Sequence, residues 1–165
     1  MKKNDGRVLV LGTCLFFAIG LLAGIKLSPI IMGAGGSVLT QINTLGIEAD
    51  IKATFFKELK YIAFLWICGF WLKREALVIT GVILKGFFVG CALAWLFAQG
   101  GLRGALVYVV PLQIFSCMAV VLAGGAALYG CGSPVKAKGA FVFLIYEVFL
   151  IFLGTVLEVL ILKII

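Results

Sequence analysis

Residues 81–90, GVILKGFFVG, place a single lysine, Lys85, inside a run of glycine, aliphatic and aromatic residues. A lone charge at the centre of a membrane-spanning helix costs about 3 kcal/mol on insertion scales, so such groups usually pair and face the interior. Gly86 and Gly90 stand four residues apart, a spacing that lets two helix backbones approach closely in lipid. The stretch therefore predicts a helix packed against other helices, with a buried ammonium group that needs a carboxylate partner.

The composition of the whole chain indicates an integral membrane protein. Of its 165 residues, 64% are hydrophobic and 13% are charged, whereas soluble domains are roughly half apolar and a quarter charged. Apolar runs near the ~20 residues needed to cross ~30 Å of hydrocarbon recur along the sequence. The net charge of +7 comes from basic residues scattered between these runs. This pattern favours topology signals and contacts with the lipid bilayer over binding to nucleic acid.

The order of the apolar runs predicts an all-α fold, a polytopic membrane bundle of about five transmembrane helices in one domain, residues 1–165. The first run is too long for the apolar core of a signal peptide, and no A-x-A-like site follows it, so we expect it to remain as a helix. The second has a charge-free core of only residues 61–72, about 18 Å of helix, and a re-entrant hairpin is the alternative. The predicted crossings are residues 8–31, 55–72, 76–98, 105–129 and 140–162.

The longest polar stretch of the chain, residues 33–60, follows the first crossing and reaches into the start of the predicted second crossing. Its apolar residues at helical spacing predict a short amphipathic helix at the membrane interface, over residues 37–45. They are Val38, Leu39, Ile42 and Leu45. The acids of this stretch are expected outside the membrane, in a segment too short to position a sugar polymer for hydrolysis. They are Glu48, Asp50 and Glu58.

The basic residues of the connections predict the orientation. Short basic loops favour the cytoplasmic side, and two such loops carry Lys73 with Arg74 and Lys136 with Lys138. The N-terminus falls on the same side, which then holds seven lysines and arginines against six on the other. With five crossings, the N-terminus is cytoplasmic and the C-terminus extracytoplasmic.

The depth of Glu147 in the fifth crossing matches that of Lys85 in the third, and both crossings start on the same side. We therefore predict an intramembrane ion pair between Lys85 and Glu147. Such a pair either relays protons or ions or fixes the register of the helices, and the absence of a second acid at similar depth favours the structural role. Glu147 also shares one helix face with Gly154 and Glu158, a polar stripe.

Two further features predict close helix packing and a kink. Gly20 and Gly24 repeat the spacing of the glycine pair in the third crossing, which favours a contact between backbones. Pro111 lies inside the fourth crossing, where it removes a backbone hydrogen bond and frees a carbonyl group. The amide of Gln113 could satisfy that carbonyl or bond across helices.

The residue inventory excludes several kinds of chemistry. The chain has no histidine, which excludes histidine metal sites and histidine-based acid–base catalysis. Its five cysteines form no C-x-x-C pair and are expected to be small buried hydrophobes. We therefore expect no metal, no cofactor and no enzymatic activity.

One segment of the chain, residues 55–115, resembles a known family of membrane proteins. It begins with FFKELKYIAFLWICGFWLKREALVITGVILKGFFVG and ends with QGGLRGALVYVVPLQIF. Within it, Lys85-Gly86-Phe87 followed by Gly90 is similar to the K-G-F…G pattern of the stage II sporulation protein M family of endospore-forming bacteria. The GLRG turn followed by Pro111 resembles the next element of that family. The first and fifth crossings agree with the family in placement.

The resemblance implies a non-catalytic membrane scaffold that acts in forespore engulfment. Its implied partners are two extracytoplasmic peptidoglycan-degrading enzymes, stage II sporulation proteins D and P. Its implied location is the mother-cell membrane at the septum. A small transporter or channel that uses Lys85 and Glu147 is the alternative, and a homo-oligomer is left open.

Overall fold

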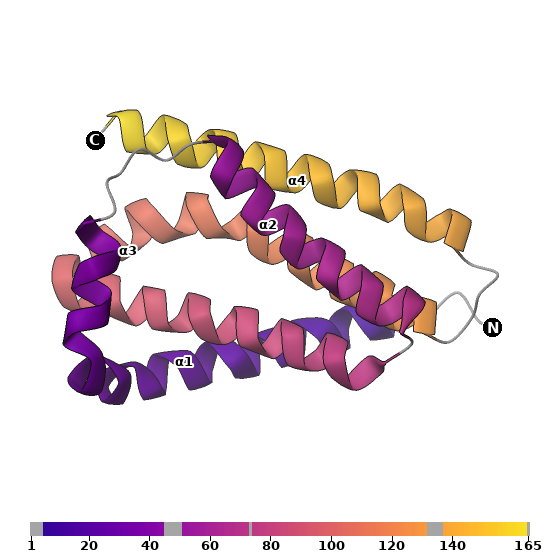
Figure 1. Ribbon diagram of the computed structural model, residues 1–165, viewed down its shortest axis with the longest axis horizontal. Helices are drawn as coiled ribbons and strands as arrows, with labels where there is room; N and C mark the ends of the chain where they lie inside the picture. The colour runs from indigo at the N-terminus through magenta and orange to yellow at the C-terminus, as the bar shows by residue number, and fades with distance from the viewer. Residues whose placement is uncertain (1–4, 45–50, 73, 132–136, 165) are drawn as a thin grey trace.

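The computed structural model describes residues 5–44, 51–72, 74–131 and 137–164, which form helices and no strand (Figure 1). This confirms the all-α prediction. Four α-helices and one π-helical turn follow one another in the order α1 (Asp5–Thr44), α2 (Ile51–Trp66), η1 (Ile67–Trp71), α3 (Glu75–Cys131) and α4 (Ala137–Ile164).

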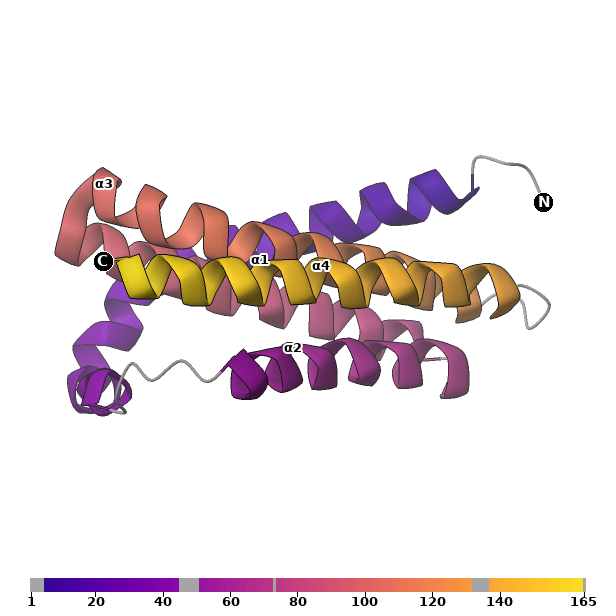
Figure 2. The same ribbon diagram turned by 90° about the horizontal axis from the view of Figure 1, so that it is seen from above.

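The helix α3 doubles back on itself, so that one helix contains the residues of two predicted crossings. Its 57 residues reverse direction at one end of the bundle (Figures 1 and 2). In a straight helix Val82 and Gly124 would be about 63 Å apart, yet a Cβ atom added at Gly124 would lie 2.7 Å from Val82 Cγ2. We call residues 75–98 the first arm and residues 114–131 the second arm.

Two stretches of the described residues are long and apolar enough to cross a membrane, Val8–Ile30 in α1 and Glu75–Trp95 in the first arm of α3. They correspond to the first and third predicted crossings. The second arm and α4 contain shorter apolar stretches, Ile114–Tyr129 and Val142–Leu157. The helix α1 begins at one end of the bundle and α4 ends at the other (Figure 1).

The helix α2 and the turn η1 run in one direction along the bundle (Figures 1 and 2), and the hairpin alternative would require them to fold back. The last part of α1 leaves the long axis and runs across the end of the bundle (Figure 2). Pro29 lies inside this helix, near the predicted end of the first crossing. The predicted interfacial helix is helical as far as Thr44, and Leu45 lies outside the described residues.

The hydrophobic core lies among α2, the two arms of α3 and α4. Three alanines at four-residue spacing, Ala119, Ala123 and Ala127, bury one face of the second arm completely. Their small side chains allow neighbouring segments to approach closely. The larger side chains that fill the core are Ile62, Leu65, Val78, Val82, Val120 and Ile151.

The helix α1 packs on the first arm of α3 through glycines on both helices. A Cβ atom at Gly20 would overlap the carbonyl oxygen of Ile83, and one at Gly24 would overlap that of Phe87. In return, a Cβ at Gly86 or Gly90 would overlap a backbone carbonyl oxygen of α1. The structure thus brings the two predicted glycine pairs into one contact, in which backbone touches backbone.

Candidate functional site

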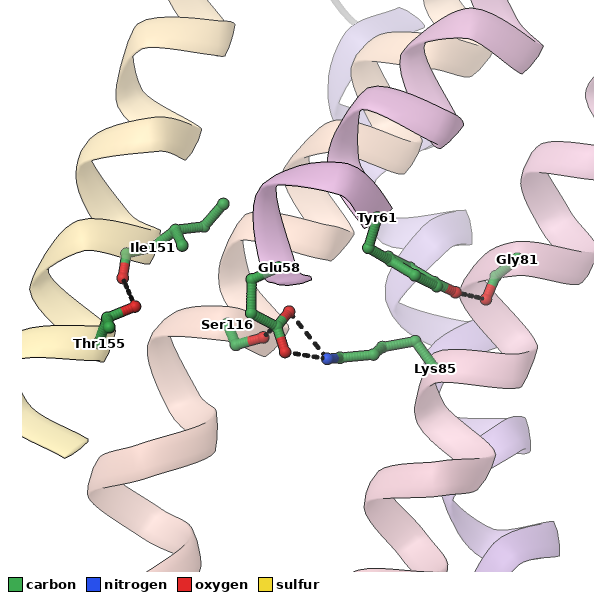
Figure 3. Close-up of polar contacts among 7 residues, drawn as sticks. All are labelled: Glu58, Tyr61, Gly81, Lys85, Ser116, Ile151 and Thr155. Atoms are coloured by element: carbon green, nitrogen blue, oxygen red, sulfur yellow. Dashed lines mark hydrogen bonds and ion pairs between the residues drawn. The ribbon is translucent and has the colours of Figure 1, made fainter. Parts of the chain in front are cut away.

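A polar cluster inside the bundle joins α2 to both arms of α3 (Figure 3). Lys85 Nζ lies 2.6 Å from Glu58 Oε1 and 2.8 Å from Glu58 Oε2. The hydroxyl of Ser116 donates a hydrogen bond of 2.7 Å to Glu58 Oε2. Both carboxylate oxygens of Glu58 are therefore bound, and one residue from each of three segments takes part. We call Glu58, Tyr61, Lys85 and Ser116 the polar cluster.

Tyr61 adds two contacts to the polar cluster from the same face of α2 as Glu58, since the residues are three apart on a helix. Its hydroxyl donates a hydrogen bond to the backbone carbonyl of Gly81. Lys85 Nζ lies 5.6 Å from the centroid of its ring, within the range of a cation–π interaction. Gly81 also lets α2 pack closely here, because a Cβ there would lie 2.8 Å from Leu65 Cδ2.

The polar cluster is electrically neutral and largely withdrawn from the surface. The side chains of Lys85 and Glu58 are 15% and 16% exposed. A buried ammonium group needs both a counter-charge and hydrogen-bond acceptors, and Glu58 supplies both. This arrangement links three helical segments through one carboxylate.

The predicted ion pair between Lys85 and Glu147 is wrong. Lys85 binds Glu58, an acid predicted from the sequence to lie outside the membrane. Glu147 is fully buried in α4 and accepts a hydrogen bond of 2.7 Å from Trp66 Nε1. The physical reason is that matched depth fixes the position of a residue along a helix axis but not the direction in which its helix face points.

A periodic pattern in the sequence could have identified Glu58 as an inward-facing residue. Phe55, Glu58, Ile62 and Leu65 recur at steps of three and four residues, so they share one helix face. Ile62 and Leu65 are buried, and Phe55 packs against the core. The acid is the one polar member of an apolar stripe. The neighbouring charges of Lys57 and Lys60 instead limited the charge-free core of the predicted second crossing to residues 61–72.

Glu147 has an incompletely satisfied carboxyl group. Its Oε2 atom is held by Trp66, and its Oε1 atom is buried without a hydrogen-bond partner. Trp66 also stacks on Phe70, with ring centroids 4.6 Å apart. The single hydrogen bond from the indole is therefore the contact that fixes this acid against α2.

Trp66 stands where α2 passes into the π-helical turn η1. The turn is closed by a hydrogen bond of 3.0 Å from the Leu72 amide to the Ile67 carbonyl. A π-helical turn holds one more residue than an α-helical turn, and such turns are frequent at functional sites. In η1 the backbone at Gly69 lies against Ala127, where an added Cβ would be 2.5 Å from the Ala127 side chain.

Replacing Trp66 with phenylalanine should lower the free energy of unfolding by about 1–3 kcal/mol, the cost of leaving a buried polar group without its partner. Phenylalanine keeps the stacking on Phe70 but has no N–H group for Glu147. The measurement is unfolding in detergent, followed by circular dichroism. The matched control is the same substitution in a Glu147→Leu background, where the cost should shrink. An equal cost in both backgrounds would show that the hydrogen bond contributes nothing.

The remaining predicted residues are placed only in part. Gly154 of α4 lies against the second arm, where a Cβ would be 3.0 Å from Phe115 Cβ. Pro111 and Gln113 belong to α3 and Glu158 to α4, but their side chains lie outside the described part of the chain. The predicted kink contacts and the end of the polar stripe therefore stay predictions.

The described side chains include no group of three or more histidine, cysteine, aspartate or glutamate residues placed to hold a metal ion. The candidate site thus consists of the neutral polar cluster and the buried acid Glu147. Comparison of the chain with family models, curated proteins and solved structures finds no match.

Proposed function

We propose that this chain is a multi-span membrane protein that acts as a non-catalytic scaffold of the sporulation engulfment machinery. In this proposal it anchors extracytoplasmic peptidoglycan-degrading enzymes, the stage II sporulation proteins D and P of the resemblance. The observation that carries the proposal is the internal neutralisation of Lys85 by Glu58 at 2.6 Å. Both residues belong to the segment that resembles the family, and together they stabilise the bundle without forming a reactive site.

The outer surface of the bundle supports membrane embedding. Large apolar side chains are exposed along α1 and α4, in faces that would be costly in water and suit contact with lipid chains. On α1 they include Val8, Leu11, Leu15, Ile19 and Leu22. On α4 they include Val142, Ile145, Tyr146, Phe149 and Phe152.

One end of the bundle suits the binding of partners. The transverse part of α1, the reversal of α3 and the last residues of α4 lie together at this end (Figures 1 and 2). With a cytoplasmic N-terminus, this end is extracytoplasmic, where enzymes that degrade peptidoglycan act. We therefore assign partner binding to this end.

The proposal makes a prediction about topology. A reporter fused after the C-terminus should read extracytoplasmic, and reporters fused near Lys73 and Lys136 should read cytoplasmic, because short basic loops stay inside. Alkaline phosphatase and a fluorescent protein provide the two opposite readouts. A cytoplasmic C-terminus would contradict the five-crossing arrangement, and the short second crossing, in α2, would then be the first one to re-examine.

The function is tested by affinity purification of the tagged chain from sporulating cells. The two hydrolases should co-purify with it. Substitutions at residues 100–104, between the two arms of α3, should lose the hydrolases at unchanged abundance of the chain. Substitution of Lys138, at the opposite end, is the matched control and should retain them. Recovery of the chain without either hydrolase would contradict the proposed function.

A transport function is the second candidate, and the unpartnered oxygen of Glu147 is the observation that favours it. Buried acids within membrane helices often mark pathways for protons or cations. Proteoliposomes that hold the purified chain would show proton flux under an applied gradient, and Glu147→Gln would abolish it. Absence of flux in the parent protein would exclude this candidate for protons.

A further inference from the structure

Two exposed lysines on α2, Lys57 and Lys60, lie near the middle of the bundle rather than at its end. The register of α2 on α3 is fixed by contacts at Gly81, where an added Cβ would lie 2.8 Å from Leu65 and 3.8 Å from the hydroxyl of Tyr61. One turn further along both helices, Glu58 binds Lys85 at 2.6 Å. Lys57 and Lys60 flank Glu58 in sequence, so they share the level of Lys85.

That level is the centre of a candidate membrane span. Lys85 is the middle residue of the stretch Glu75–Trp95. The outer end of the stretch, at Trp95, is ten residues beyond Lys85, or about 15 Å of helix. A lysine can recover part of this distance by extending its side chain towards the lipid headgroups. If the bilayer beside α2 had its full thickness, the rest of this distance would leave both ammonium groups within hydrocarbon.

The two ammonium groups have no protein partner in the described part of the chain. Both side chains are exposed, and the carboxylate of Glu58 between them is bound to Lys85 and Ser116. An unpaired cation is strongly unfavourable at the centre of the bilayer. The surroundings of Lys57 and Lys60 must therefore be polar or anionic.

The apolar surface of α2 is short, and that of α1 is long. Between Lys60 and Trp71, which is 84% exposed, α2 and η1 together offer about 16 Å of helix. On α1 the apolar stretch Val8–Ile30 has 23 residues, about 34 Å of helix. The two helices lie on opposite sides of the bundle (Figure 2). A bilayer of uniform thickness cannot match both sides, and a short apolar surface is accommodated by thinning of the bilayer.

We propose that the bilayer is thinned beside α2 and that the phosphate groups of anionic phospholipids descend to Lys57 and Lys60. Charge complementarity selects this occupant, because two unpaired ammonium groups face outward at one level and anionic headgroups are attracted to basic residues. Trp71 anchors the other edge of the thinned region, as interfacial tryptophans do. The proposal rests on the membrane embedding argued under the proposed function.

Depth measurements on two matched labels test the thinning. Gly86 faces Phe17 and Leu21 of α1, so the exposed Ile19 lies at the level of Lys85 on the side opposite α2. Spin labels are placed at Ile19→Cys and at Phe56→Cys, beside Lys57, in a chain whose native cysteines are replaced. The chain is reconstituted in vesicles of phosphatidylcholine and phosphatidylglycerol. Oxygen and a water-soluble nickel complex report the depth of each label.

The label at residue 19 should lie deep in hydrocarbon, and the label at residue 56 should lie near the headgroups. Equal depth in hydrocarbon for both labels would overturn the proposal. A label at residue 56 that neither reagent reaches would also overturn it, because a second copy or a partner protein would then cover α2. A label at residue 19 outside hydrocarbon would contradict the membrane embedding itself, so the two failures are distinguishable.

Native mass spectrometry of the full chain with its natural cysteines tests the lipid. The affinity of the chain for phosphatidylglycerol should decrease about thirtyfold when Lys57 and Lys60 are both replaced by glutamine. The reason is that each basic residue contributes about 1 kcal/mol near an anionic surface. Lys26→Gln, an exposed lysine on α1, is the matched control and should retain the lipid. Equal retention in the double variant and the control would overturn the assignment of the two lysines.

Discussion

Gly20→Ala should lower the free energy of unfolding by about 3 kcal/mol or more. Gly12→Ala, at an open position of the same helix α1, should leave the free energy of unfolding unchanged or raise it. A Cβ at Gly20 would overlap the backbone carbonyl of Ile83, and a Cβ at Gly12 meets nothing within 4 Å. Overpacking of a close contact typically costs about 1–3 kcal/mol and occasionally more, and a backbone atom cannot move aside as a side chain does. Alanine at an open helix position gains up to about 1 kcal/mol over glycine.

The two variants share helix, residue type and substitution, so helix propensity cancels between them. Unfolding in detergent gives the difference directly. A second substitution in the same contact, Gly86→Ala, should cost less in the Gly20→Ala background, because the helices are already separated and neighbouring sites are not additive. Equal stability of Gly20→Ala and Gly12→Ala would show that α1 and α3 do not touch through their backbones.

Lys85→Met should lower the free energy of unfolding by about 3–5 kcal/mol, and a second substitution at Glu58 should recover most of the loss. Removing one member of a buried pair leaves an uncompensated charge, whereas neutralising both members can be nearly neutral. Glu58→Gln is the appropriate second change, because its amide oxygen still accepts the hydrogen bond from Ser116. Steady-state abundance in membranes and unfolding in detergent both report the result.

The matched control replaces the other buried acid. Lys85→Met combined with Glu147→Leu should recover nothing, because Glu147 binds Trp66 and makes no contact with Lys85. Rescue by Glu147→Leu and not by Glu58→Gln would show that Lys85 pairs with Glu147, as predicted from the sequence. Full stability of Lys85→Met alone would show that the ion pair contributes no stability to the bundle.

The helical character and the glycine contact could be predicted from the sequence because both are local properties. Apolar runs of sufficient length favour helices whatever surrounds them. The spacing of Gly20 and Gly24, like that of Gly86 and Gly90, removes side chains from one face of a helix. Such a face favours close approach of another backbone, and the structure brings the two faces together.

The partner of Lys85 could not be predicted in the same way, because it depends on how three segments rotate and slide against one another. Depth along the chain suggested Glu147, but α4 directs that carboxyl towards Trp66. The register of α2 carries Glu58 from the edge of the predicted crossing to the centre of the bundle. That register depends on the small residues Gly69 and Gly81, which admit Ala127 and Leu65 respectively.

The helical character of this protein, its apolar exterior and the need of Lys85 for a counter-charge can all be predicted from the sequence. These follow from hydropathy, spacing and the cost of burying an ion. Three features depend on how the helices pack: Glu58 supplies the counter-charge, Glu147 keeps an unpartnered oxygen, and Lys57 and Lys60 lie at mid-level on the exposed face of α2. The physical reason is that a helix fixes the spacing of its own residues, whereas packing against its neighbours fixes its rotation and its position along the bundle.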